Sequence, residues 1–443
     1  MSEYFQIEGG YPLVGEIKAS GAKNAAIKQL IVSMLSEEPT LLLNVPRIGD
    51  VEITKQLCEW VGAKFIWQGK NSLLLHTPSL KHHSIPKEIG QKNRMSIMLM
   101  APLLHRVGKA ILPTPGGCKI GSRPVNFHID AIRKMGANAE YQDGFYTISA
   151  PNKLKGAKIR LPYPSVSATE NILMCASLAK GHTLLENAAM EPEVFDSIQM
   201  LQKMGAIIEV QANRRILIEG VDKLYGTEHR VLPDRLEVAS YAVAALASRG
   251  DVFVKDAQQK DMLTFLNTLR RMGGNFAIYH DGIRFFYRQP LRSITIETDV
   301  YPGFATDWQQ PFTLLLTQAK GVGIVHETVY ENRFGYAQGL QNLGGEIHLF
   351  RKCLGDLPCR FRESSYFHSA VVRGPSTLKG THLHIPDLRG GCSYLIAALV
   401  AEGKSTLTGI ELLERGYEQI EEKFRQLGAN ITRLHTCPKT AAA

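Results

Sequence analysis

The sequence predicts an α/β protein built as six copies of one small unit, and three observations support this fold class. The first is a recurring phrase, in which an apolar, helix-like stretch ends on Leu, Met or Val followed by Gly and then Ala or Gly. The six copies are Val61-Gly62-Ala63, Met135-Gly136-Ala137, Met204-Gly205-Ala206, Met272-Gly273-Gly274, Leu343-Gly344-Gly345 and Leu427-Gly428-Ala429. Successive glycines are 74, 69, 68, 71 and 84 residues apart. This spacing is too regular for chance and too long for a solenoid repeat of about 20 to 50 residues.

The second observation is what surrounds each glycine. Gly adopts the left-handed conformation that ends a helix without a Cβ penalty. An alternating, strand-like segment such as 207–210 then follows. Each unit is therefore expected to run helix, glycine stop, strand.

The third observation is another helix in each unit, which begins polar and becomes apolar. Its six openings lie at 22–25, 92–95, 168–171, 233–236, 306–309 and 386–389. Each leads into a stretch such as 394–401 that is apolar nearly all round, which is typical of a buried helix. Helix N-termini that carry Lys and Arg suit phosphate and carboxylate ligands. Ordinary N-capping is the alternative for any single copy.

Composition and charge narrow the function classes. With 443 residues, of which 44% are hydrophobic, the chain can form two or three domains, and six units divide naturally into three and three. The net charge of +9 is compatible with nucleic acid, an anionic membrane or small anions. The chain has no long basic run and no interleaved aromatic and basic residues. We therefore expect small anionic substrates and no nucleic-acid partner.

Cysteine usage and the N-terminus predict the compartment. The seven cysteines are Cys58, Cys118, Cys175, Cys353, Cys359, Cys392 and Cys437. They are odd in number and lack the paired spacing of zinc sites, so we expect a reducing compartment, no metal and no cofactor. The sequence shows no signal peptide and no apolar run approaching about 18 residues. These features predict a cytoplasmic protein without a membrane partner, either a monomer or a weak homo-oligomer.

A loop at 112–124 is the strongest local candidate for chemistry. It contains three prolines and three glycines around Cys118, so it can be neither a helix nor an interior strand. Lys119 and Arg123 lie close in sequence, and nearby cations favour the reactive form of a cysteine. Cys118 is therefore a candidate acid or nucleophile, with an incidental exposed thiol as the alternative.

Several motifs resemble those of the enolpyruvyl transferase family, and within it the UDP-N-acetylglucosamine 1-carboxyvinyltransferases. They lie at 20–26, 44–51, 115–118, 168–171, 232–235, 331–334, 387–389 and 415–417. Because they occur in order along nearly the whole chain, chance is not a serious alternative.

The resemblance implies a fold of two inside-out α/β barrel domains. Each has three βαβαββ-type units with buried central helices. The first domain would span 22–232 and carry the Cys118 loop, and the second would combine 1–21 with 233–443. The active site is expected in the cleft between them. The crossings near 19–22 and 232–234 would act as a hinge, and closure would exclude water from the reaction.

The resemblance also implies the reaction. An acceptor hydroxyl, the 3-hydroxyl of UDP-N-acetylglucosamine, adds to C2 of phosphoenolpyruvate, C3 is protonated, and phosphate then leaves. This reaction opens peptidoglycan synthesis. Cys118 matches the acid that protonates C3, which is also the cysteine alkylated by fosfomycin in the family. Asp307 matches the carboxylate that faces the acceptor hydroxyl.

The remaining matched positions bind the two substrates. The family positions that hold the phosphate and carboxylate of phosphoenolpyruvate correspond to Lys23, Arg94, Arg123, Arg389 and Arg415, most of them Arg with its bidentate fork. Of these, Lys23, Arg123, Arg389 and Arg415 are expected to be catalytic. The other expected substrate-binding residues are Asn24, Pro124, Val125, Asn126, Phe127, Ser165, Val166, Ser167, Val329, Arg333, Asp387 and Leu388.

Some acceptor-side positions differ from the family pattern. Asn126-Phe127 stands where Asp-Leu usually faces the uridine, Ser167 replaces a Gly, and Cys392 follows Gly390-Gly391 where a Ser is usual. The last repeat interval is also long, with a basic, cysteine-bearing stretch at 351–379.

Three explanations for these differences remain open. The first is drift within one enzyme family. The second is a paralogue that acts on another uridine nucleotide, and the third is a non-catalytic paralogue that binds nucleotide sugars. The shikimate-branch transferase lacks the cysteine-containing Pro-Gly-Gly loop and is disfavoured.

Overall fold

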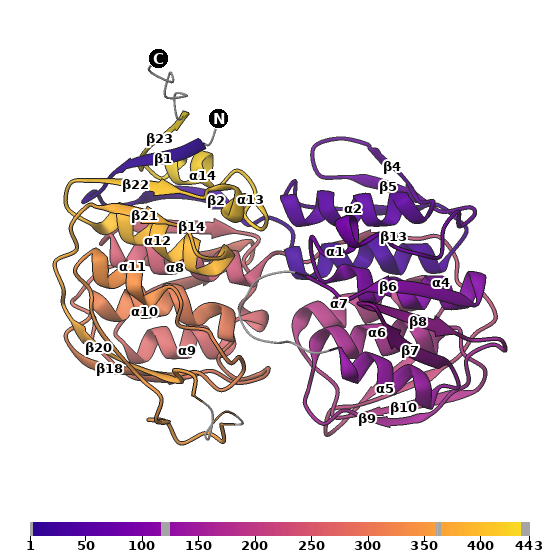
Figure 1. Cartoon of the computed structure of the whole chain (residues 1–443). Helices are drawn as coiled ribbons and strands as arrows, with labels where there is room; N and C mark the ends of the chain where they lie inside the picture. The colour runs from indigo at the N-terminus through magenta and orange to yellow at the C-terminus, as the bar shows by residue number, and fades with distance from the viewer. Residues whose placement is uncertain (1–2, 117–124, 360, 362–364, 436–443) are drawn as a thin grey trace, which may run out of the picture. The chain divides into compact units, whose positions relative to one another are not determined.

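The computed structural model describes residues 3–116, 125–359, 361 and 365–435 (Figure 1). These residues form two compact units. We call the first the terminal unit, because it contains the described residues in 3–20 and 233–435. The second, the central unit, contains 21–116 and 125–232.

Each unit consists of three βαβαββ repeats. The repeat at 158–219 shows the pattern: β9 (Lys158–Arg160), α6 (Val166–Ser177), β10 (His182–Glu186), α7 (Pro192–Lys203), β11 (Ile207–Gln211) and β12 (Arg215–Glu219). Its sheet has the order β11-β12-β10-β9, in which β9 is parallel to β10 and the other pairs are antiparallel. The predicted six-copy α/β array is confirmed.

The other two central repeats follow this order closely. In the second of them, an isolated bridge between Ser84 and Ile111 stands in place of the first strand, so that its sheet has three named strands among the described residues. One comprises β13 (Glu228–Arg230), α1 (Lys23–Val32), η1 (Ser33–Leu35), β3 (Thr40–Leu43), α2 (Gly49–Val61), β4 (Lys64–Trp67) and β5 (Leu73–His76). The next comprises α3 (Lys87–Gly90), η2 (Met95–Leu99), α4 (Met100–Val107), β6 (Lys109–Pro113), α5 (Asn126–Lys134), β7 (Asn138–Gln142) and β8 (Phe145–Ser149).

The terminal unit contains the remaining three repeats. The first comprises β2 (Val14–Lys18), α8 (Arg235–Ala247), β14 (Asp251–Lys255), η3 (Gln259–Asp261), α9 (Leu263–Arg271), β15 (Asn275–Tyr279) and β16 (Gly282–Phe286). The second comprises β17 (Thr295–Glu297), η4 (Thr306–Trp308), α10 (Gln309–Thr317), β18 (Gly321–His326), α11 (Ala337–Asn342), β19 (Glu346–Phe350) and β20 (Ser369–Gly374). The third comprises β21 (His382–His384), α12 (Leu388–Val400), β22 (Lys404–Thr408), α13 (Glu411–Glu414), α14 (Ile420–Gln426), β23 (Asn430–His435) and β1 (Glu3–Glu8).

The N-terminal strands belong to the terminal unit. β1 pairs with β22 and β23, and β2 pairs with β14. The chain then enters the central unit at 21 and leaves it at 232. Two backbone hydrogen bonds fix these crossings, from Ala22 N–H to the Leu232 carbonyl at 2.7 Å and from Asp234 N–H to the Ser20 carbonyl at 2.8 Å.

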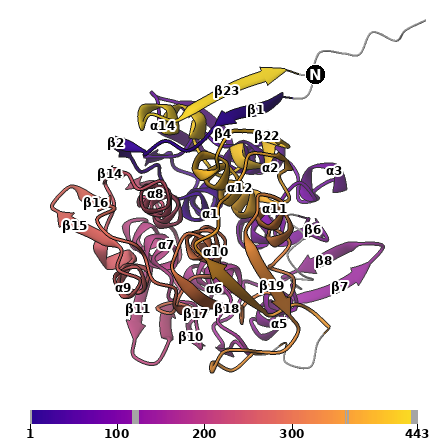
Figure 2. The ribbon, with the colours of Figure 1, turned by 90° about the vertical axis from the view of Figure 1, so that its left-hand side faces the viewer.

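One helix of each repeat is buried, as the all-round apolar sequence predicts. In the terminal unit α8, α10 and α12 pack on one another, with the sheets outside them (Figure 2). In the central unit α1, α4 and α6 occupy the corresponding core. Each unit has its own hydrophobic cluster. The predicted inside-out arrangement, with helices inside and sheets outside, is confirmed.

The six repeated glycines have the backbone geometry that the sequence predicts. All six have φ between +86° and +121°, a region that residues with a Cβ rarely adopt. They follow α2, α5, α7, α9, α11 and α14.

Side-chain caps set the start of several buried helices. Asp234 and Asp387 cap α8 and α12 by accepting backbone N–H groups. The α6 helix begins before its predicted opening at 168–171, because the Ser165 hydroxyl already accepts the Ala168 N–H at 3.4 Å. Within the described ranges no helix is both long and apolar enough to cross a bilayer.

Candidate active site

A carboxylate held by two arginines lies in the terminal unit. Asp307 is part of η4, directly before the buried helix α10. Arg333 Nη2 contacts one of its carboxylate oxygens, and Arg389 Nε lies 3.5 Å from the other. The two Arg side chains are 3% and 5% exposed, whereas that of Asp307 is 25% exposed. Asp307 is therefore fixed by buried cations and still open to solvent.

Arg389 has unused hydrogen-bonding capacity. It lies in the first turn of α12, where the Asp387 carboxylate accepts its backbone N–H at 2.9 Å, and its guanidinium carbon lies 5.2 Å from the Tyr417 ring centroid. Nη1 and Nη2 are buried and form no hydrogen bond of ordinary geometry among the described residues, although the Tyr417 side chain is close enough to the guanidinium to interact with it. Burial opposes the charge of Arg389, but Tyr417 and Asp307 raise its pKa well above the ordinary value. The arrangement offers a charged, forked donor to an anion.

Glu327 organises the loop that carries Arg333. Its carboxylate is buried and accepts the N–H groups of Val329 and Tyr330 at 2.8 and 2.9 Å. It also accepts hydrogen bonds from the side chains of Thr306 and Gln309, both at 2.9 Å. Burial raises the pKa of Glu327, with Arg333 acting in the opposite direction. The sequence analysis missed this residue, whose one signal is an acidic side chain directly after an apolar strand.

In the central unit Lys23 begins the buried helix α1. Its Nζ lies 3.0 Å from Asp50 Oδ2, near the start of α2. Asn24 follows and is half-buried. The motifs 20–26 and 44–51 meet here, because a Cβ on Gly21 would lie 1.8 Å from the Asn44 carbonyl oxygen. Only glycine allows this approach of the two segments.

Arg94, His128 and Ser167 form a second group in the central unit. His128 Nε2 lies 3.2 Å from Ser167 Oγ. Burial, and then the charge of Arg94, lowers the pKa of His128 to about 3, so His128 is neutral near neutral pH. Sequence reasoning predicted Arg94 and Ser167 but missed His128, which contacts Ser167 and is influenced by the charge of Arg94.

The remaining predicted residues differ in exposure. Val125 and Leu388 are buried in the cores at 4% and 6% exposure, so their side chains pack inside the protein. Asn126 is exposed and Phe127 half-buried, both in the first turn of α5. Ser165 and Val166 are half-buried at the start of α6. Arg415 is half-buried directly after α13. Cys118, Arg123 and Pro124 lie outside the described residues.

The structure thus groups the predicted residues within each unit. In the terminal unit it brings together Asp307, Arg333 and Arg389, with Asp387 at the start of the helix that carries Arg389. In the central unit it pairs Lys23 with Asp50 and brings Arg94 and Ser167 to His128. Cations beside a half-open carboxylate suit anion binding and proton transfer.

Comparisons with known proteins agree on one family. The model of EPSP synthase (3-phosphoshikimate 1-carboxyvinyltransferase) matches residues 7–424. A UDP-N-acetylglucosamine 1-carboxyvinyltransferase of Protochlamydia amoebophila is 48% identical over 97% of this chain and 94% of its own length. One of the same name from Chlamydia pneumoniae is 44% identical over 99% and 98%.

Solved structures share the fold at lower identity. The enolpyruvyl transferase NikO of Streptomyces tendae matches 98% of this chain and 99% of its own, with a TM-score of 0.85 and 23% identity. An EPSP synthase of Acinetobacter baumannii matches 98% and 100%, with a TM-score of 0.73 and 18% identity. The chain therefore belongs to the EPSP synthase family of enolpyruvyl (1-carboxyvinyl) transferases.

Proposed function

We propose that this protein transfers the enolpyruvyl group of phosphoenolpyruvate to the 3-hydroxyl of UDP-N-acetylglucosamine and releases phosphate. The observation that carries the proposal is the identity of 43–48% to transferases of that name over nearly the whole chain. The reaction would be the first committed step of peptidoglycan synthesis, in the cytoplasm.

The terminal unit would supply the base and part of the anion site. In the addition step the acceptor oxygen bonds to C2 of phosphoenolpyruvate, and its proton passes to the Asp307 carboxylate. The two unfilled Nη groups of Arg389 suit the phosphate or carboxylate of that substrate. Arg333 holds Asp307 in place, and Arg415 would add a further cation.

The central unit would supply Lys23 and the acid. Lys23 lies at the N-terminus of a buried helix, where the helix dipole favours an anion. Cys118 would protonate C3 during addition. During elimination a proton leaves C3 and the C2–O bond to phosphate breaks, which yields the enol ether and free phosphate. The division into domains 22–232 and 1–21 with 233–443 forms part of this proposal.

One contact bears on the altered acceptor positions. The Ser167 hydroxyl, which replaces the usual glycine, already contacts His128 in the same unit. The extra side chain is therefore accommodated by internal packing, which supports drift within the family over a changed acceptor.

An acceptor panel tests the substrate. Phosphate release from phosphoenolpyruvate would be followed with UDP-N-acetylglucosamine, UMP, other UDP-sugars and shikimate 3-phosphate. We expect kcat/KM for UDP-N-acetylglucosamine to exceed every other value by about two orders of magnitude, since losing several buried hydrogen bonds costs about 3 kcal/mol or more. A higher value for another acceptor would contradict the proposed substrate.

Fosfomycin labelling tests the cysteine separately. Peptide mass spectrometry should find the adduct on Cys118 and not on Cys58 or Cys175, both of which are buried. Labelling that persists in Cys118→Ala would show that another cysteine reacts.

A further inference from the structure

One repeat of the terminal unit carries a long connection between its last two strands. Other repeats join the corresponding strands by short turns, such as Asp143-Gly144 between β7 and β8 and His280-Asp281 between β15 and β16. In contrast, β19 ends at Phe350 and β20 begins at Ser369. Two cysteines, Cys353 and Cys359, lie in this connection.

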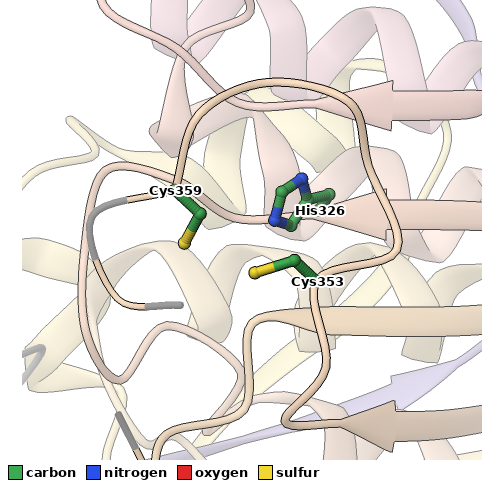
Figure 3. A group of neighbouring side chains, drawn as sticks. All are labelled: His326, Cys353 and Cys359. Carbon is green, nitrogen blue, oxygen red and sulfur yellow. The ribbon is translucent and has the colours of Figure 1, made fainter. Parts of the chain in front are cut away.

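These cysteines meet a buried histidine. His326 is the last residue of β18 and is fully buried. One ring nitrogen of His326 and the sulfurs of Cys353 and Cys359 all lie within 4.8 Å of one another. Figure 3 shows a ring nitrogen of His326 directed toward the two sulfur atoms.

The histidine is oriented as a metal ligand would be. Its Nδ1 lies 3.1 Å from Glu297 Oε2, so the carboxylate holds the ring proton on Nδ1. The other nitrogen, Nε2, is left with its lone pair. It is buried and has no hydrogen-bond partner among the described residues. Leaving a buried polar atom without a partner is unfavourable, and a bound cation would remove that cost.

The connection is built onto this histidine and carboxylate. A Cβ on Gly355 would lie 2.1 Å from His326 Nδ1 and 2.2 Å from Glu297 Oε2, so only glycine fits there. The Leu357 N–H donates to Glu297 Oε2 at 2.8 Å, and the Leu354 N–H donates to Ser369 Oγ at 3.0 Å. These contacts hold the segment between the two cysteines against Glu297 and His326, and they keep Cys353 and Cys359 close to His326.

The sulfur environment is also suited to a thiolate ligand. The Phe361 N–H donates to Cys359 Sγ at 3.4 Å, a contact that stabilises negative charge on sulfur.

We propose that His326, Cys353 and Cys359 bind one Zn²⁺ ion, with water as the fourth ligand. Two thiolates and one imidazole form a donor set that zinc prefers, and Glu297 acts as the carboxylate behind the histidine. Donor atoms around a tetrahedral zinc lie about 3.5–3.8 Å apart, given bonds of about 2.0–2.3 Å. Because the three donor atoms lie within 4.8 Å of one another, no pair would have to close by more than about 1.3 Å to reach this spacing. Binding displaces one proton from each thiol, and no redox change occurs.

The ion would fasten the 351–368 connection to strand β18. Glu327, which follows His326 directly, holds the loop that carries Arg333. The proposed zinc site therefore adjoins the loop that carries Arg333, but the ion takes no part in the proposed reaction.

Metal binding to the full chain tests the proposal. The reduced protein, freed of metal by a chelator, would be titrated with Zn²⁺ alone, and bound metal measured by elemental mass spectrometry. We expect one ion per chain. Cobalt(II) in its place should give a thiolate charge-transfer band in the near ultraviolet and the visible bands of a four-coordinate ion.

Matched variants locate the site. Cys353→Ala, Cys359→Ala and His326→Gln should each weaken binding at least tenfold, whereas the control Cys175→Ala should bind as the parent does. Glu297→Gln should weaken zinc binding about 10- to 100-fold but keep the cobalt spectrum. Circular dichroism of the metal-free variants verifies that they fold.

The opposite results are equally clear. Less than stoichiometric zinc, a cobalt spectrum without the thiolate band, or unchanged affinity in both cysteine variants would overturn the proposal. A Cys353–Cys359 disulfide in the protein isolated without added oxidant would also overturn it. Turnover does not enter any of these readouts, so this test is independent of the proposed activity.

Discussion

The central and terminal units share the βαβαββ repeat but treat their buried charges differently. In the central unit, Lys28 and Glu170 form an ion pair whose side chains are 6% and 2% exposed. In the terminal unit, Asp307 is shared by two arginines, and Arg389 keeps two buried nitrogens without a hydrogen-bond partner among the described residues. The same scaffold therefore holds a closed ion pair in one unit and, in the other, a carboxylate with two arginines that we propose binds an anion. Under this proposal, function depends on residues at the ends of the buried helices and not on the repeat itself.

The connections between strands show a second difference. The central hairpin β7–β8 turns within two residues, whereas the terminal β19–β20 connection runs from Phe350 to Ser369. A long connection needs its own anchors. Among its described residues, the Leu357 N–H donates to Glu297, and Cys353 and Cys359 lie close to His326.

The largest expected effect follows from removing the carboxylate of Asp307 in the terminal unit. Asp307→Asn keeps the size and hydrogen bonding of the side chain but removes the base. We expect kcat to fall about 10²- to 10⁴-fold, the usual contribution of a positioned base. Steady-state phosphate release measures this effect. Asp256→Asn, which alters a surface pair with Lys18, should leave kcat unchanged. An Asp307→Asn enzyme with near-normal kcat would remove Asp307 from the mechanism.

Removing one partner of the buried Lys28–Glu170 pair of the central unit should lower the free energy of unfolding. Lys28→Met leaves Glu170 buried without its cation, which costs about 3–5 kcal/mol of unfolding free energy. Burial raises the pKa of Glu170 to about 7 even with Lys28 present, so the loss should shrink as the pH falls and Glu170 becomes neutral. Urea unfolding at several pH values measures both effects.

The surface pair Lys18–Asp256, in which Lys18 is 56% exposed, provides the control. Lys18→Met should cost about 1 kcal/mol or less. Equal losses for the two lysine variants would show that burial of the central pair has no energetic consequence.

Arg389 tests whether its unfilled donors meet the substrate. If the guanidinium stabilises developing charge, Arg389→Ala should raise the activation free energy by about 3 kcal/mol, which lowers turnover roughly a hundredfold. Arg284→Ala, which removes an exposed pair with Asp251, should not change turnover. Unchanged turnover in Arg389→Ala would contradict the assignment.

The effect that is smallest near neutral pH, and that grows as the pH falls, concerns His128. The unfolded chain takes up a proton near the ordinary pKa of 6.5, while folded His128 takes it up only near 3. Folding stability should therefore fall as the pH drops from about 6.5 toward 3, by about 1.4 kcal/mol per pH unit for this group. His128→Gln should reduce that slope in thermal or urea unfolding. His280→Gln, whose side chain is 94% exposed, should retain it, and parallel slopes for all three proteins would refute the role of His128.

Features with a local cause could be predicted from the sequence. The six glycines mark helix ends because positive φ excludes most other residues. The buried helices can be recognised in the sequence because a helix with no solvent-exposed face carries no stripe of polar residues. The substrate residues were predicted from motifs, and their roles stay predictions.

Features that depend on tertiary contacts could not be predicted. Glu327 matters because its carboxylate meets Thr306 and Gln309 from a different element, and His128 because it meets Ser167. The expectation of no metal considered cysteine spacing alone. His326 lies at the end of strand β18, outside the connection that carries the cysteines, and only the fold brings it to Cys353 and Cys359.

Product analysis tests the central claim most directly. The protein would be incubated with phosphoenolpyruvate and UDP-N-acetylglucosamine, and the product examined by mass spectrometry and NMR. We predict one carboxyvinyl group on the 3-hydroxyl of the sugar for each phosphate released, with none formed by Asp307→Asn above the residual rate. Phosphate release without the enol ether, or an unmodified sugar after prolonged incubation, would contradict the account.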